Sequence, residues 1–208
     1  MINYLPQILS VLAIHLLAVI SPGPDFIVAV KNSVSYSRRI GIYTAIGFGL
    51  GIGVHVTYSV LGIALIISQS IIIFNTIKLI GAFYLIYIGF QSLRARGGKI
   101  DIPIESSKNT LSPFKAVKIG FFTNVLNPKA TLFFLSLFTL VISPTTPFVI
   151  QTVMGLLMML NTFLWFSFVA IVLTQGKARK IFEKNRVVFD RVLGLGLIAL
   201  GIRVATSK

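Results

Sequence analysis

Long apolar runs separated by short polar stretches follow one another along nearly the whole chain. An α-helix crosses the roughly 30 Å hydrocarbon core of a bilayer with about 20 apolar residues, and these runs are close to that length or longer. The pattern predicts six membrane-spanning helices, at residues 5–30, 42–67, 71–92, 119–143, 148–173 and 188–204. The expected fold class is an all-α integral membrane protein.

The polar stretch at residues 94–112 differs from the other connections, because it is long and contains Gly97, Gly98 and Pro103. Glycine and proline in such a cluster mark a loop. We therefore expect a linker here, between two halves of three spans each, at approximately 1–93 and 113–208. The whole chain, 1–208, is interpreted as a single transmembrane domain.

Composition supports this class, since 55% of the 208 residues are hydrophobic, 12% are charged and the mean hydropathy is +0.91. A chain of this size with six spans leaves no room for a separate soluble domain. The absence of cysteine excludes disulfides, thiolate metal ligands and thiol nucleophiles.

The basic residues concentrate after the first, third and fifth spans, for example at Arg38 and Arg39, at Arg94 and Arg96, and at Lys177 to Arg191. Lysine and arginine are enriched in cytoplasmic loops, so these loops are expected inside and both termini outside. The net charge of +14 is then explained by loops that contact anionic lipid headgroups. Nucleic acid is not expected as a partner.

Two spans are interrupted at matching positions in the two halves. The first contains Ser21, Pro22, Gly23, Pro24 and Asp25, and the fourth contains Asn127, Pro128 and Lys129. A break or a charge at membrane depth persists only where it faces protein or water. Because each half has an odd number of spans, related halves would form a 3+3 inverted repeat, with broken helices 1 and 4 at a transport site.

These motifs resemble the LysE/RhtB family of bacterial amino-acid exporters. The resemblance covers nearly the whole chain and rests on the Ser21 to Asp25 segment, the glycine-rich second span, Gly120-Phe121, Asn124 to Ala130, and Gly194 to Gly201. It implies a multi-pass protein of the bacterial cytoplasmic (inner) membrane. It also implies efflux of amino acids or close derivatives, with neutral, hydrophobic or homoserine- and threonine-like substrates favoured. The proton gradient would supply the energy, without a bound cofactor.

The residues themselves suggest a mechanism of this kind. Asp25 is expected to be the only carboxylate within a span, and Lys129 its only deeply placed basic counterpart. Our hypothesis is that Asp25 binds the substrate ammonium or the exchanged proton, while Lys129 and freed amides near Gly23 attract the substrate carboxylate. Asn124 and Asn127 can donate to a carboxylate and accept from an ammonium.

Structural alternatives remain open for each of these residues. Asp25 and Lys129 could form an ion pair that holds two broken helices together, and the asparagines could bind carbonyls released by Pro128. His15 and His55 are interpreted as hydrogen-bonded packing residues. The second-span glycines indicate close helix packing, either within one subunit or in a homodimer.

Two other functional classes compete with amino-acid export. A cation or metal exporter of the same superfamily is the main alternative, but it requires several converging oxygen or nitrogen ligands. An enzyme is not expected, because the sequence offers no paired carboxylates, no Ser/His arrangement and no metal-ligand set.

Overall fold

The computed structural model describes residues 4–21, 23–69, 71–94, 110–140, 142, 146–172, 174 and 176–206. These residues form helices and no strands, so the all-α class is confirmed. The helices are α1 (Leu5–Ile20), α2 (Pro24–Ser35), α3 (Arg38–Gln69), α4 (Ile71–Leu93), α5 (Pro113–Val125), α6 (Pro128–Leu140), α7 (Phe148–Val172) and α8 (Gly176–Ala205). Most of the predicted linker, at 95–109, lies outside the described residues.

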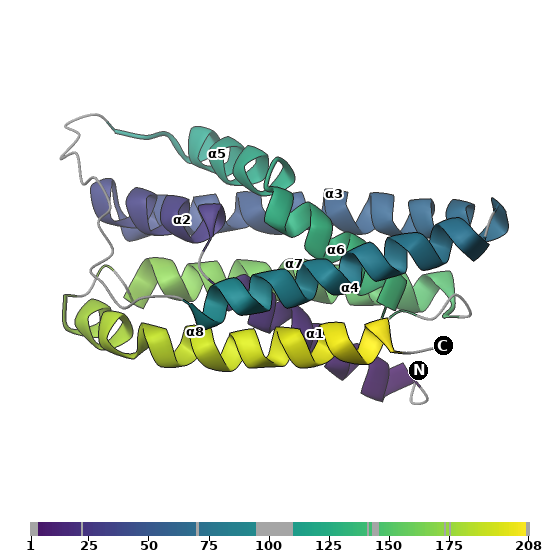
Figure 1. Ribbon diagram of the computed structural model, residues 1–208. Helices are drawn as coiled ribbons and strands as arrows, with labels where there is room; N and C mark the ends of the chain where they lie inside the picture. The colour runs from purple at the N-terminus through teal and green to yellow at the C-terminus, as the bar shows by residue number, and fades with distance from the viewer. Residues whose placement is uncertain are drawn as a thin grey trace.

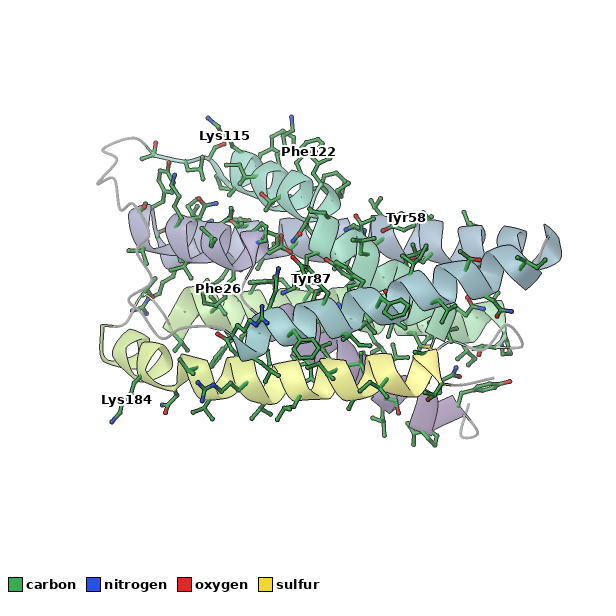
Figure 2. The ribbon with its side chains drawn as sticks, in the orientation of Figure 1. Phe26, Tyr58, Tyr87, Lys115, Phe122 and Lys184 are labelled. Carbon is green, nitrogen blue, oxygen red and sulfur yellow. The ribbon has the colours of Figure 1, made fainter. Side chains whose placement is uncertain are left out.

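The long helices lie side by side in one bundle, and both chain termini are at the same end (Figure 1). Helices α3, α5 and α8 begin toward the opposite end, where α4 finishes. Several basic residues lie toward that end, including Arg38, Arg39 and Lys184, the last of which is labelled in Figure 2. The fold therefore separates most of the described cationic positions from the termini.

Membrane-crossing length is reached by α3 over Arg38–Gly62 and by α7 over Phe148–Val172. The α1 and α2 pair gives a third span if its two parts, bent by 63°, are taken together. The bundle exposes large apolar side chains such as Phe122 of α5, which points away from the bundle in Figure 2. Such a surface suits lipid, whereas the count of six spans remains a prediction.

The second-span glycines pack against helices of the same chain. A Cβ atom added at Gly47 would lie 2.1 Å from the Val117 carbonyl oxygen of α5, and one at Gly120 would lie 2.1 Å from the Thr44 carbonyl oxygen of α3. Gly49 and Gly53 face Met159 of α7 less tightly, since an added Cβ would lie 3.1 Å and 3.2 Å from the nearest Met159 atom. Small residues thus let α5 approach α3 closely.

Both predicted interruptions are confirmed as helix breaks. Helix α1 ends at Ile20 and α2 begins at Pro24, while α5 ends at Val125 and α6 begins at Pro128. Proline suits the first position of a helix because its missing N–H would have no partner there. The fold brings these two breaks together in the interior of the bundle.

Candidate functional site

The carboxylate of Asp25 is bound by two side-chain amides from the other half of the chain. Asn124 Nδ2 donates a hydrogen bond to Asp25 Oδ2 at 2.7 Å, and Asn127 Nδ2 donates to Asp25 Oδ1 at 3.1 Å. Asn124 lies in the last turn of α5, and Asn127 precedes α6. The second break therefore holds the charged group of the first.

The ammonium of Lys129 makes the reciprocal contact. Its Nζ donates to the carbonyl oxygen of Ser21 at 2.8 Å, and its side chain passes close to Gly23. A Cβ at Gly23 would lie 3.5 Å from Lys129 Cδ, which is ordinary van der Waals distance. The backbone of the first break therefore holds the charged group of the second.

Asn127 connects these contacts, because it also caps α6. Its Oδ1 accepts a hydrogen bond from the backbone N–H of Lys129 at 3.0 Å. An N-cap asparagine satisfies one of the free N–H groups at a helix start. One amide side chain therefore fixes both the start of α6 and one oxygen of Asp25.

The two charged groups line one small cavity, the central cavity, of about 40 Å³. Small-molecule pockets are usually roughly 300–1,000 Å³, so the central cavity has room for water but not for an amino acid in this conformation. Its polar wall comes from the two breaks, and its apolar wall comes mainly from phenylalanines of α2, α6 and α7. The lining includes Ser21, Gly23, Asp25, Asn124, Asn127, Lys129, Phe26, Phe133, Phe134 and Phe166.

Most of the predicted site residues are brought together at this cavity. Pro24 and Pro128 occupy the first positions of α2 and α6 and line a neighbouring cavity instead. Pro22 lies outside the described residues. Asn124 Oδ1 is a buried acceptor that has no hydrogen-bond partner among the described atoms, and it lies against Gly51 of α3.

His15 lies at the central cavity, which the sequence does not indicate. Ten residues of straight helix would separate it from Asp25 by about 15 Å, but the chain bends between them. Asn161 Nδ2 donates to His15 Nδ1 at 3.3 Å, and Thr162 Oγ1 lies 3.4 Å from His15 Nε2. The expected hydrogen-bonded packing role is confirmed, and the ring also forms part of the cavity wall.

His55 contacts the backbone of Asn124, which is one of the site residues. Its Nε2 lies 3.0 Å from the carbonyl oxygen of Asn124, and its Nδ1 lies 2.7 Å from the Tyr58 hydroxyl. The ring also stacks on Phe134, with 5.4 Å between centroids. His55 therefore positions the end of α5 that supplies an amide to Asp25.

The prediction that Asp25 is the only carboxylate within a span is wrong. Asp190 of α8 falls inside the predicted span 188–204 and is only 3% exposed. It lines the neighbouring cavity together with Lys129. The signal was present in the sequence, but the basic residues before it made this segment look like part of a cytoplasmic loop.

A bundle of apolar helices in which two interrupted pairs meet over a carboxylate and an ammonium is typical of a membrane transporter. Residues 16–208 match the family described as LysE type translocator, and the chain belongs to this family. The resemblance inferred from the sequence motifs is thereby confirmed.

Similar proteins cover nearly the whole chain. The membrane protein YrhP of Bacillus subtilis (strain 168) is 28% identical over 208 residues, which cover 97% of this chain and 99% of that protein. The threonine efflux protein of Escherichia coli (strain K12) is 29% identical over 205 residues, covering 96% and 98%. That of Salmonella typhimurium is 29% identical over 200 residues, covering 96% and 97%. No solved structure matches the chain.

Proposed function

We propose that this protein exports amino acids or close derivatives from the cytoplasm by proton antiport. Neutral, hydrophobic or homoserine- and threonine-like substrates are favoured, because relatives of 29% identity are named threonine efflux proteins. The membrane is the bacterial inner membrane, and both termini lie outside. The family membership and the apolar helix surface support this proposal.

The observation that carries the proposal is the pair of opposite charges at the central cavity. Side-chain amides bind the Asp25 carboxylate and a backbone carbonyl binds the Lys129 ammonium, so each charged group is hydrogen-bonded to an uncharged group. A zwitterionic amino acid offers an ammonium to Asp25 and a carboxylate to Lys129, and such charge-assisted hydrogen bonds are the strong ones. The positive end of the α6 dipole further favours a carboxylate beside Lys129.

The same aspartate gives a simple route to coupling. Asp25 can hold a substrate ammonium when it is ionised, and it loses that charge when it takes a proton. Occupancy by the substrate and occupancy by the proton therefore exclude each other at one carboxylate. Exchange of the two across the membrane is antiport, and it requires no group beyond the chain's own residues.

The arrangement of the helices supports the inverted repeat as part of this proposal. Each interrupted pair, α1 with α2 and α5 with α6, resumes with a proline followed by a charged residue, Asp25 or Lys129. In Figure 1, α1 starts from the end that holds the termini, whereas α5 starts toward the opposite end. Six spans in two oppositely oriented halves fit this arrangement.

The test is efflux of a panel of radiolabelled amino acids from preloaded, energised vesicles. We expect selective efflux by the native protein, its loss with a proton uncoupler, and at least a tenfold fall in Asp25→Asn. That substitution is nearly isosteric and removes only the titratable charge, so insertion into the membrane should be retained. Lys31→Gln is the matched control, because it removes an exposed charge from the same helix.

Efflux by Asp25→Asn at the native rate would contradict the coupling role of Asp25. The absence of efflux of every amino acid from folded native protein would contradict the proposed function and place the cation exporter first. Efflux that continues in the presence of the uncoupler would contradict proton antiport but retain amino-acid export.

A further inference from the structure

A second cavity lies against the other side of the two breaks. This α4/α8 cavity has a volume of about 390 Å³, which is within the range of small-molecule sites. Its walls come from α4, from α8 and from both breaks, and it is lined by Ser21, Gly23, Pro24, Tyr84, Tyr87, Ile88, Gln91, Ser92, Asn127, Pro128, Lys129 and Asp190. It therefore has room for an amino acid where the central cavity has not.

The two cavities share one wall. Ser21, Gly23, Asn127 and Lys129 line both of them. These residues belong to the breaks, so the broken backbone and the Lys129 side chain separate the central cavity from the α4/α8 cavity. A substrate that passes from one to the other has to pass Lys129.

Close packing of α4 on α8 positions the acidic group of this cavity. A Cβ at Gly89 would lie 2.7 Å from the Gly194 carbonyl oxygen, so the two backbones nearly touch there. Asp190 is one helical turn before Gly194, and Ser92 is one turn after Gly89. Because the helices run antiparallel in Figure 1, this contact places Asp190 opposite the last turn of α4.

The α4/α8 cavity repeats the chemistry of the central cavity. Asp190 offers carboxylate oxygens, and Ser92, Tyr87 and Gln91 offer further acceptors for an ammonium. The Gln91 amide nitrogen donates to the Tyr87 hydroxyl, which leaves the Gln91 carbonyl oxygen as an acceptor. Lys129 supplies the cationic partner, so a zwitterion meets a carboxylate and an ammonium here as well.

We propose that the α4/α8 cavity is the cytoplasmic loading site of the exporter, where Asp190 binds the ammonium of an amino-acid substrate and Lys129 binds its carboxylate. Lys129 then turns toward the central cavity with the carboxylate, and Asp25 replaces Asp190 as the partner of the ammonium. This inference rests on the proposed function and on the predicted cytoplasmic position of the end where α4 finishes. It adds a second acidic residue to the path.

Thiol accessibility tests the loading site directly, because the chain contains no cysteine and Ser92→Cys would carry the only thiol. A membrane-impermeant, positively charged methanethiosulfonate reagent should modify this variant from the cytoplasmic face. Saturating threonine, or whichever amino acid the native protein exports, should slow the reaction about fivefold or more. Lys184→Cys is the matched control, since Lys184 is exposed on α8 outside the cavity and should react equally with and without substrate.

Equal rates for Ser92→Cys with and without substrate would overturn the loading site. Reaction only from the face that carries the termini would also overturn it. Protection from the cytoplasmic face, without protection of Lys184→Cys, would support it.

Asp190→Asn tests the binding role of the carboxylate. We expect the half-saturating substrate concentration at the cytoplasmic face to rise about tenfold, which is the order expected for one lost hydrogen bond to a charged group. The half-saturating concentration at the outer face, measured by counterflow, should stay unchanged, and Asp190→Glu should recover part of the loss. A purely structural role would change both faces together or neither.

The outcomes separate the two proposals. If the native protein exports no amino acid, the proposed function fails. If it does export and Asp190→Asn behaves like the native protein at both faces, only the loading site fails. If Asp190→Asn does not fold, protection of Ser92→Cys decides the question alone.

Discussion

At the residue scale, Asn127 has two separable roles, because its oxygen caps α6 while its nitrogen binds Asp25. We expect Asn127→Ala to lose both: about 1 kcal/mol for the cap, and a larger amount for a hydrogen bond to a charged group. The variant should therefore show a lower melting temperature in detergent and at least a tenfold lower efflux rate.

Asn127→Ser provides the matched comparison. Serine is also a good N-cap, but its hydroxyl is too short to cap α6 and reach Asp25 as well. The melting temperature should recover toward the native value while efflux stays low. Recovery of both quantities together would mean that Asn127 acts only by starting α6.

At the scale of the helices, glycine allows α5 to pack closely against α3. A Cβ at Gly47 would overlap backbone atoms of α5, whereas a Cβ at Gly62, on the same helix α3, would meet nothing within 4 Å. Gly47→Ala should destabilise the protein by about 1–3 kcal/mol, because two backbones have to separate. Efflux should fall with it, since α5 supplies Asn124 to the site.

Gly62→Ala is the control for the alanine side chain itself. Alanine favours a helix over glycine by about 1 kcal/mol, so this variant should melt at the native temperature or slightly above it. Thermal denaturation in the same detergent gives both values. A native-like melting temperature for Gly47→Ala would show that α3 and α5 do not need their close contact.

At the scale of the whole molecule, the distribution of charge should determine the orientation in the membrane. The described basic residues at the starts of α3 and α8 lie away from the end that carries both termini (Figures 1 and 2). A membrane-impermeant thiol reagent added to intact cells should therefore label Thr206→Cys and should label Lys184→Cys only after permeabilisation.

The reverse labelling pattern would contradict the predicted orientation, and it would also move the loading site to the outer face. Labelling of both variants in intact cells would contradict the assignment of the two ends of α8 to opposite sides of the membrane. The cysteine-free native chain serves as the background for both variants.

The sequence by itself determined the features that depend on local chemistry. Apolar composition dictates a helical membrane protein, because only internally hydrogen-bonded helices suit a hydrocarbon environment in a chain of this pattern. Proline and glycine determined both breaks, since proline lacks the N–H that a continuous helix needs. Asp25 and Lys129 could be predicted as site residues because a charge at membrane depth is costly and is retained mainly for function.

Only the tertiary structure decided how these groups are held. Asp25 meets Asn124 and Asn127 across about a hundred residues of chain, and His15 reaches the same cavity because the chain bends after α1. Asp190 joins Lys129 because glycines let α4 and α8 touch. Hydropathy and residue spacing show which segments prefer lipid, but they do not show which helix faces pack together. The packing of those faces determines the position of Asp190 and of the two cavities.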